Sequence, residues 1–428
     1  MIETAQNEGS MSSREQASRP GSGYVEEVTE TVRPVVPHTS RGPVRWSVRR
    51  RRDAWLLLLA FLVGSATIVV LSGGLSQHPP QTREAQAGQA SLPRAQTQAA
   101  APSTTPAIGT FQEYPLPQPN DGLMRLVIDH QGRLWFGEMN RNFLAVFDPR
   151  TRAFQQWTPP GGKYGIMGIQ VAPDDTIWFA EQYANYIGHY FPATGRYQLY
   201  HLPWFTVPDP GNPGKTLLLP VAPNDLALDA RGNVWFTELN AGALGRLDTH
   251  NGFIQYYPLA DKKDAQALAP YGVTVDQQGM VWFTEMGGKH IGRLDPVTGG
   301  IRLYALPGQS AASMEIVSDA RGTIWATTFT ANALLSLDPR TGTFTLYSVT
   351  VGGSGAGGLY DLVITPDNNV WVTVSADSAI ARLDVSTRRF TSYRIPTASS
   401  LPIGIAAGAN HTLWFTEAGS DKIGMLQA

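Results

Sequence analysis

The chain has 428 residues, of which 42% are hydrophobic and 11 are tryptophans, enough to build a large core. The formal net charge of −2 gives no argument for a nucleic-acid partner, and the absence of cysteine excludes disulfide frameworks, thiolate catalysis, zinc ribbons and iron–sulfur clusters. The 43 glycines and 31 prolines favour many turns between short strands over long helices.

The first 108 residues predict a membrane anchor between two polar segments. Residues 1–53 are rich in Ser, Glu, Arg and Pro without apolar periodicity, which predicts a disordered cytoplasmic tail. Residues 54–75, AWLLLLAFLVGSATIVVLSGGL, carry no charge and are long enough for a single transmembrane helix. Arginines at 41, 45 and 49–52 precede it, so we expect the N-terminus in the cytoplasm and the remainder outside. The alternative, a cleaved secretory signal, seldom has so long a leader.

Residues 76–108 are a mixture of Gln, Ala, Pro, Thr and Ser, which predicts a solvated linker. From residue 109 onward one pattern recurs: an apolar strand, a turn with Asp and Gly, a strand holding Trp, a strand ending in Leu-Asp, and an aromatic strand. The tryptophans of this pattern stand 43 to 57 residues apart: Trp135, Trp178, Trp235, Trp282, Trp325, Trp371 and Trp414. Four strands in a period of this length predict an all-β fold, a seven-bladed β-propeller over residues 109–428.

The ends of the repeat region predict how the ring closes. The seventh unit stops at Ala428 with three strands, whereas residues 111–117 (FQEYPLP) resemble a fourth strand and precede the first unit. We therefore expect this N-terminal strand to complete the last blade, which removes an open sheet edge. Gly232, Gly279 and Gly322 are expected to take positive φ in the first turn of their units.

The repeat resembles a known family. The phrases VWFTELNAGALGRLD, VWFTEMGGKHIGRLD and LWFTEAGSDKIGML, with fourth strands ending in YPLP or YALP, are similar to those of the virginiamycin B lyase family over residues 109–428. The resemblance implies the seven-bladed propeller. For active members it also implies magnesium-assisted ring opening of a cyclic depsipeptide antibiotic by histidines in the last two blades, with an aromatic hydroxyl in the first and glutamates holding the metal.

The positions that carry those histidines lie eleven residues before each tryptophan. In this chain none of them is histidine. They are Met124, Met167, Asn224, Tyr271, Met314, Tyr360 and Ile403. Proton abstraction beside a carbonyl needs a base with a pKa near neutrality, so lyase activity is not expected.

One position further on, glycine alternates with charged residues. The seven residues are Arg125, Gly168, Asp225, Gly272, Glu315, Asp361 and Gly404. Because inner strands converge at the channel mouth, we expect these groups to meet near the axis. Two interpretations stay open: Asp225, Glu315 and Asp361 hold Mg²⁺ or Ca²⁺, or Arg125 pairs with the acids as a structural plug. Arg125, Asn224, Tyr271 and Tyr360 are the candidate ligand-binding residues at this mouth.

Two further features concern the same end of the ring. Five glutamates recur three residues after the tryptophan, and their repetition suggests that they satisfy backbone groups between blades. They are Glu138, Glu181, Glu238, Glu285 and Glu417. Insertions at residues 201–223, 261–269 and 352–358 lie between units, where Trp204 and Phe205 either shield a ligand or pack over the rim.

These features predict a membrane-anchored, extracytoplasmic propeller that binds a small molecule, a glycan or a protein on its loop-rich face. The alternative is an enzyme, either a divergent lyase or a divalent-metal-dependent lactonase acting on a cyclic ester. A purely structural scaffold is the third possibility. No nucleic-acid partner is expected.

Overall fold

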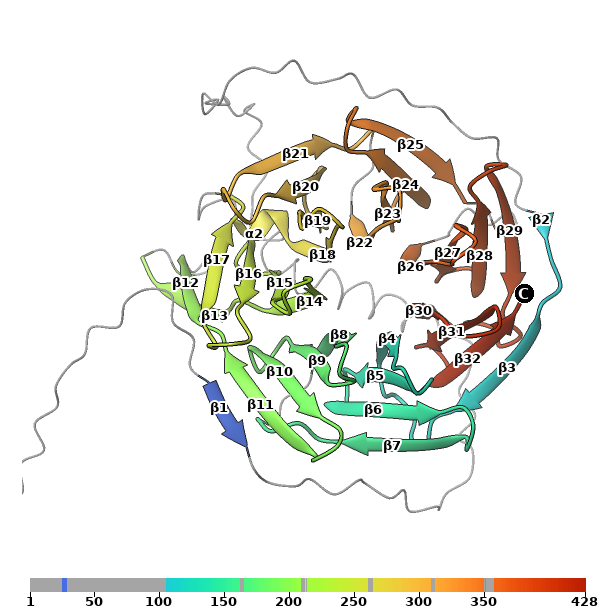
Figure 1. Ribbon diagram of the computed structural model, residues 1–428, viewed down its shortest axis with the longest axis horizontal. Helices are drawn as coiled ribbons and strands as arrows, with labels where there is room; N and C mark the ends of the chain where they lie inside the picture. Colours follow the sequence, from blue (N-terminus) through green and yellow to red (C-terminus); the bar gives the residue numbers. More distant parts are fainter. Residues whose placement is uncertain are drawn as a thin grey trace, which may run out of the picture.

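The computed structural model describes residues 25–28, 105–161, 165–208, 212, 214–260, 265–308, 312–349, 351 and 358–428. Within them, seven sheets with four strands of the repeat each are arranged as a ring around a central channel (Figure 1). Each inner strand contacts the inner strand of the next blade, and β30 contacts β4 to complete the circle. The predicted seven-bladed propeller is confirmed.

The strands of each blade are lettered a to d from the channel outward. Blade 1 consists of β4 (Leu123–Ile128), β5 (Leu134–Glu138), β6 (Phe143–Asp148) and β7 (Ala153–Trp157). Blade 2 consists of β8 (Ile166–Val171), β9 (Ile177–Glu181), β10 (Tyr186–Phe191) and β11 (Arg196–His201). Blade 3 consists of β14 (Pro223–Leu228), β15 (Val234–Glu238), β16 (Ala243–Leu247) and β17 (Ile254–Pro258). Blade 4 consists of β18 (Pro270–Val275), β19 (Val281–Glu285), β20 (His290–Leu294) and β21 (Ile301–Ala305). Blade 5 consists of β22 (Ser313–Ser318), β23 (Ile324–Thr328), β24 (Ala333–Asp338) and β25 (Thr343–Ser348). Blade 6 consists of β26 (Leu359–Ile364), β27 (Val370–Val374), β28 (Ala379–Asp384) and β29 (Arg389–Arg394). Blade 7 consists of β30 (Pro402–Ala407), β31 (Thr412–Glu417), β32 (Lys422–Gln427) and β3 (Thr110–Pro115).

Blade 7 joins the two ends of the repeat region. Strand β3 pairs antiparallel with β32, with Thr110 opposite Gln427 and Pro115 opposite Lys422. The side chain of Lys422 also contacts Glu113 on β3, with 2.8 Å between Nζ and Oε2. The N-terminal strand therefore supplies strand d of the last blade, as the strand count predicts.

Two short strands extend the outer edges of other blades. Strand β1 (Val25–Val28) pairs antiparallel with β11, and β2 (Thr105–Pro106) pairs parallel with β29. For its four residues, β1 differs from the disorder expected of residues 1–53, because strand d of blade 2 offers unpaired backbone groups that a neighbouring segment can join. The other residues of the tail, residues 54–75 and the linker up to residue 104 lie outside the described residues. Among those described, no helix has the length and apolar character needed to cross a membrane.

The turn between strands a and b is organised by an aspartate. In four blades its carboxylate accepts a hydrogen bond from the indole Nε1 of the tryptophan six residues later. The pairs are Asp129–Trp135 (2.8 Å), Asp229–Trp235 (3.1 Å), Asp276–Trp282 (2.7 Å) and Asp319–Trp325 (3.1 Å). Gly232 in this turn has φ of 80°, which confirms the predicted positive value. The recurring Asp and Trp are thus one structural unit.

Threonines two residues after the tryptophan join neighbouring blades. Thr416 on β31 accepts a hydrogen bond from the backbone N–H of Gly404 (2.8 Å) and donates one to the carbonyl of Met124 in blade 1 (2.8 Å). The same pattern holds for Thr237, Thr284, Thr327 and Thr373. These threonines, and not the glutamates that follow them, bond the backbone of the next blade.

The glutamates occupy a different environment from the one expected. Each is buried at the end of strand b, and most have at least one oxygen without a hydrogen-bond partner, as for Glu138 Oε2, Glu238 Oε1 and Glu417 Oε1. Burial raises the pKa of Glu138 and Glu238 to about 8 and the pKa of Glu417 to about 7. Glu138 and Glu238 are therefore largely protonated near neutral pH.

Replacing Thr416 with valine should lower the free energy of unfolding by about 1–3 kcal/mol, because it leaves a buried N–H and a buried carbonyl unsatisfied at the junction of blades 7 and 1. Chemical denaturation measures this change. Thr151→Val, in an exposed turn, is the control and should shift stability by less than about 0.5 kcal/mol. Equal effects of the two substitutions would contradict the bridging role.

Candidate functional site

Every inner strand contains a bulge near its start. In blade 3, Pro223 pairs with Glu238 but the next paired residue, Leu226, faces Phe236, so two residues stand outside the regular ladder. The same shift occurs in the other six blades. The two bulged residues are those eleven and ten positions before the tryptophan, so the bulge separates them into two layers along the channel.

The residues eleven positions before the tryptophan form an apolar layer. This layer lies at the d–a end of the ring, which is the end that carries the connections from strand d of one blade to strand a of the next. Its members are Met124, Met167, Tyr271, Met314, Tyr360 and Ile403, all at most 5% exposed. The hydroxyl groups of Tyr271 and Tyr360 contact each other, and their rings meet edge to face with centroids 6.2 Å apart. Methionine and tyrosine therefore fill positions at which the resemblance described above implies histidine.

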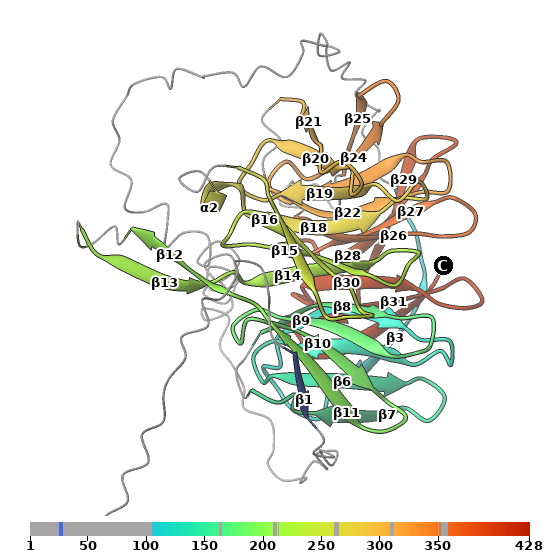
Figure 2. The same cartoon turned by 60° about the vertical axis from the view of Figure 1, so that its left-hand side comes forward.

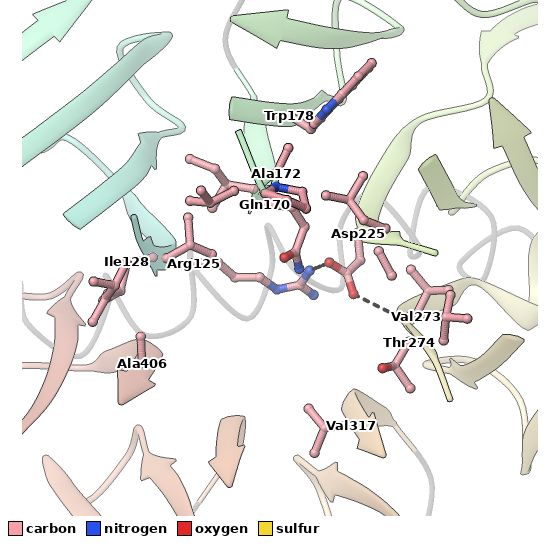
Figure 3. A pocket seen from close by; sticks show the side chains of 18 of the residues that line it. Arg125, Ile128, Gln170, Ala172, Trp178, Asp225, Val273, Thr274, Val317 and Ala406 are labelled. Atoms are coloured by element: carbon pink, nitrogen blue, oxygen red, sulfur yellow. Dashed lines mark hydrogen bonds and ion pairs between the residues drawn. The ribbon is translucent and has the colours of Figure 1, made fainter. Parts of the chain in front are cut away.

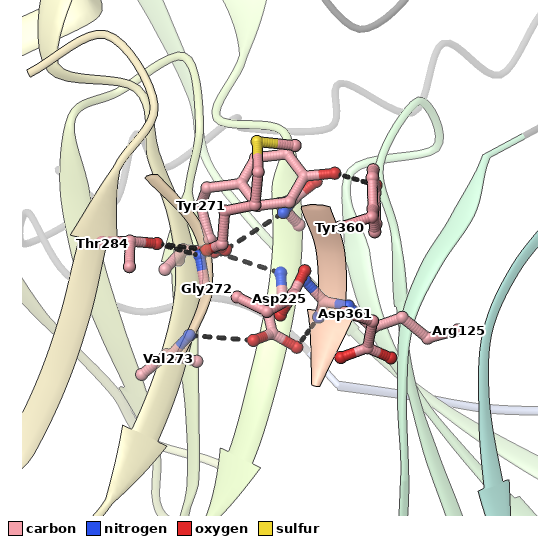
Figure 4. A network of polar contacts seen from close by, with 12 residues as sticks. Arg125, Asp225, Tyr271, Gly272, Val273, Thr284, Tyr360 and Asp361 are labelled. Carbon is pink, nitrogen blue, oxygen red and sulfur yellow. Dashed lines mark hydrogen bonds and ion pairs between the residues drawn. The ribbon is translucent and has the colours of Figure 1, made fainter. Parts of the chain in front are cut away.

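The charged residues ten positions before the tryptophan lie directly beneath this layer (Figure 4). The guanidinium of Arg125 makes ion pairs with Asp225 and Glu315 and lies 5.8 Å from the centre of the Tyr271 ring. Asp361 joins the same cluster through its electrostatic interaction with Arg125. The sequence places these groups at the channel mouth, whereas the structure places them inside the channel.

Two of the carboxylates are held by backbone groups as well. Asp225 accepts hydrogen bonds from the N–H groups of Leu226 and Val273, both 2.8 Å long. Asp361 accepts from Leu362 (2.8 Å) and from Ile405 (3.0 Å). In each case the second donor belongs to the next blade, so these aspartates fix both their own bulge and the neighbouring strand.

The alternation of glycine with charged residues has a steric cause. A Cβ on Gly168 would lie 2.7 Å from the carbonyl oxygen of Asn224, and a Cβ on Gly404 would lie 2.8 Å from Cα of Arg125. A charged side chain therefore enters the channel where the preceding blade has glycine. Because seven is odd, the alternation must fail once, and it fails where Glu315 and Asp361 occupy adjacent blades.

This break leaves three carboxylates around one guanidinium. Burial raises the pKa of Glu315 to about 7 and the pKa of Asp361 to about 6, against the attraction of Arg125. Burial also opposes the charge of Arg125, but the surrounding carboxylates keep its pKa above the ordinary value. The geometry supports the ion-paired plug, one of the two interpretations of these residues.

No group of three or more His, Asp or Glu side chains with the arrangement of a metal site is present in the described part of the chain. Asp225, Glu315 and Asp361 do converge, yet Arg125 stands between them. A divalent ion at the same place would meet the positive charge of the guanidinium. Mg²⁺ or Ca²⁺ at these residues remains a prediction.

The other predicted site residues lie in separate places. Asn224 is buried, donates from Nδ2 to the carbonyl of Tyr271 (3.0 Å) and accepts from Gln182 (3.3 Å), so it bridges blades 3 and 4. Trp204 is the first residue of the hairpin formed by β12 (Trp204–Pro208) and β13 (Thr216–Pro220).

This hairpin projects from the d–a end of the ring, beside the short helix α2 (Ala265–Leu268) that precedes blade 4 (Figure 2). Phe205 packs against the core cluster between blades 2 and 3. Trp204 is 47% exposed and Leu218 is 62% exposed. The insertion thus has one anchored aromatic residue and an exposed apolar surface.

The histidines of the ring stand apart from the charged cluster. His189 stacks on Trp178 with ring centroids 3.7 Å apart, and burial lowers its pKa to about 4. His290 is the first residue of β20, with Nδ1 3.2 Å from Oε2 of Glu285. His130 and His411 lie in a–b turns, His250 in a c–d turn and His201 on β11.

Beneath the charged cluster the channel opens into a cavity of about 1110 Å³ (Figure 3). It extends toward the a–b end of the ring, the end that carries the turns between strands a and b, since its lining continues from Arg125 through Ile128 to His130. Arg125, Asp225, Glu315 and Asp361 line its inner limit. Sequence reasoning missed this cavity because the residues along it repeat as ordinary strand residues.

Comparison with known proteins agrees with this architecture. The model of the virginiamycin B lyase family matches residues 94–360 and 298–428. The chain belongs to this family. Among curated proteins no sequence matches it.

Solved structures of virginiamycin B lyases share its shape. The enzyme from Staphylococcus aureus is 23% identical, with the match covering 75% of this chain and 99% of that one at a TM-score of 0.65. A streptogramin B lyase is 25% identical over 74% of this chain and 97% of its own, with a TM-score of 0.64. The extracellular domain of a hybrid two-component system from B. thetaiotaomicron is 18% identical over 72% of this chain and 40% of its own, with a TM-score of 0.54, which reflects the fold alone.

A variant of the Staphylococcus aureus virginiamycin B lyase in which alanine replaces one histidine is catalytically inactive and was solved with quinupristin. In the present chain, none of the seven positions eleven residues before the tryptophan, where the resemblance to the family implies the catalytic histidines, is histidine. The chain thus shares the fold of the virginiamycin B lyase family, and the layer at its own d–a end consists of methionine, tyrosine and isoleucine side chains.

Proposed function

We propose that this protein is a membrane-anchored, extracytoplasmic member of the virginiamycin B lyase family that binds a partner on the d–a end of its propeller. One observation carries the proposal: methionine, isoleucine and the paired tyrosines occupy the layer where lyase chemistry requires histidines. Such side chains cannot act as a general base near neutral pH, and burial raises the pKa of both tyrosines further above the ordinary value.

The anchor is part of the same proposal. The uncharged residues 54–75 and the arginines before them support a single transmembrane helix with the N-terminus in the cytoplasm. The propeller would then lie on the outer side, joined to the helix by a polar linker. A linker of this kind would keep the propeller near the membrane surface, which suits a protein that holds a partner there.

The hairpin β12–β13 supports partner binding at this end. Trp204 and Leu218 are exposed on strands that pair with each other, and the hairpin base is fixed to the ring through Phe205. Exposed aromatic and aliphatic side chains on a rigid element are typical of residues that become buried in an interface. We place the principal contact of the partner on this hairpin.

Site-specific photo-crosslinking in intact cells tests the proposal. A photoreactive phenylalanine derivative at position 204 should give a discrete cross-linked species. The same residue at position 297 is the control, because Val297 is 86% exposed in a c–d turn at the opposite end of the ring. Absence of a species at position 204, or equal yields at both positions, would contradict binding at the hairpin.

A second function, metal-dependent ring opening or hydrolysis of a cyclic ester, is favoured by family membership and by the convergence of Asp225, Glu315 and Asp361. Incubation with a virginiamycin B-type antibiotic and Mg²⁺ tests it directly. Linearised product that disappears on addition of EDTA would establish this function. We expect no product and an unchanged melting temperature with EDTA.

A further inference from the structure

The cavity at the a–b end has two chemically different parts. Its inner limit is the charged cluster, and its walls come from the residues eight positions before each tryptophan, which line the channel one layer further out. Most of these wall residues are small and apolar. They are Val127, Gln170, Ala227, Thr274, Val317, Val363 and Ala406.

The size and shape of the cavity suit a small molecule. Its volume of about 1110 Å³ lies slightly above the range of roughly 300–1,000 Å³ usual for ligand pockets, so a small molecule fits within it. The buried apolar layer that contains Tyr271 and Tyr360 covers the charged cluster on the other side. A ligand would therefore enter from the a–b end with its polar group foremost.

The charges of the cluster at the inner limit of the cavity determine which polar group of a ligand can bind there. With all groups ionised, one guanidinium faces three carboxylates, which leaves two negative charges in excess. The ion pair of Arg125 with Glu315 joins Nη2 to Oε1, and Glu315 also lines the cavity. An anionic ligand would meet this excess of negative charge, and the only guanidinium of the cluster is already paired with two acids. A cation of the ligand would supply the missing positive charge.

We propose that this cavity binds a small amphipathic amine, with its ammonium group against Glu315 and Asp361 and its apolar part between the valine and alanine side chains of the inner strands. This site lies at the opposite end of the ring from the proposed partner site, and it does not depend on the proposed function.

Gln170 makes the proposal testable without destabilising the fold. Its side chain points toward the part of the channel that holds the Arg125 guanidinium (Figure 3). It is half-buried and is not part of the apolar clusters between blades. A lysine at this position would place an ammonium group of the chain itself where we expect that of the ligand.

The experiment is calorimetric titration of the full-length protein in lipid nanodiscs with hexylammonium, hexanol and hexanoate, with protein-free discs as the blank for partitioning. We expect saturable binding of hexylammonium and affinities at least tenfold weaker for the other two. Gln170→Lys should weaken hexylammonium binding at least tenfold. Gln278→Lys adds the same charge in an exposed a–b turn and should bind like the unmodified protein.

Three outcomes would overturn the proposal: no saturable binding of hexylammonium, equal binding of hexanol, or equal binding by the two lysine variants. Displacement of hexylammonium by an equal concentration of Mg²⁺ or Ca²⁺ would also overturn it and would favour a metal at the carboxylates. The melting temperature of Gln170→Lys, at or above that of Gln278→Lys, verifies that lost binding does not come from unfolding.

Discussion

Replacing Arg125 with methionine should lower the free energy of unfolding by about 3–5 kcal/mol, which is typical of breaking a buried ion pair from one side. The guanidinium is paired with Asp225 and Glu315, and methionine would leave these carboxylates and Asp361 buried together without a cation. Denaturant unfolding of the full chain, compared at equal m values, measures the change.

Two further variants identify the cause of this loss. Arg150→Met removes an arginine whose side chain is 67% exposed in its pair with Asp148, and should change stability by less than about 0.5 kcal/mol. The double variant Arg125→Met/Glu315→Gln should be more stable than the sum of the single effects, because one unpaired charge is removed. Additive effects would mean that Arg125 acts through packing alone.

The propeller should become less stable as the pH rises from 6.5 to 8.5. Burial raises the pKa of Glu138 and Glu238 to about 8 and the pKa of Glu315 and Glu417 to about 7. In this window the folded protein binds more protons than the unfolded chain, whose glutamates are already ionised, so the stability is lost as the pH passes through the folded pKa values. The expected loss is on the order of 1 kcal/mol for each group, measured as a fall in melting temperature.

Glu238→Gln is the matched variant for this pH dependence. The amide has the shape of the neutral acid and does not ionise, so the melting temperature of the variant should exceed that of the unmodified protein most strongly at pH 8.5, and the difference should shrink as the pH falls to 6.5. Below pH 6.5 one group acts in the opposite direction, because burial lowers the pKa of His189 to about 4 and protonation of this imidazole favours unfolding. A melting temperature that rises between pH 6.5 and 8.5 would refute the assignment.

The fold can be predicted from the sequence because every blade repeats the same local interactions. The tryptophan, the aspartate six residues before it and the turn glycine recur together, and the structure joins Trp282 to Asp276 as one unit. The closing strand was predicted at residues 111–117 and is observed as Thr110–Pro115, a difference of one or two residues at each end. Local chemistry repeated seven times leaves few alternatives for the architecture.

The candidate site was predicted less completely, because its geometry depends on the bulge in strand a. The sequence places Asp225 at the channel mouth, whereas β14 begins at Pro223 and contains Asp225 in its bulge. Apolar periodicity gives no sign of two residues outside the ladder. The bulge moves the charged residues below the apolar layer, and the expected open mouth becomes a covered cluster.

The repeated Trp-Phe-Thr-Glu led to a second wrong prediction for a similar reason. The bonds to backbone groups between blades were expected from the glutamate, whereas the threonine makes them. Both residues recur in five of seven blades, so their frequency does not separate them. The hydroxyl of Thr237 reaches the carbonyl of Tyr271 in the next blade at 2.8 Å, whereas Glu238 is buried at the end of its own strand. The direction of each side chain, which the sequence does not reveal, determines whether the threonine or the glutamate bonds the next blade.

The shared blade also sets the order in which the molecule can assemble. Residues 110–115 are synthesised some 300 residues before the strand β32 with which they pair. Until residues 422–427 emerge from the ribosome, six blades form an arc that has exposed edges at both ends and is open to pairing with other chains. The contact that closes the ring is thus the last to form, and the sheet edges are protected from aggregation only after the whole chain has been synthesised.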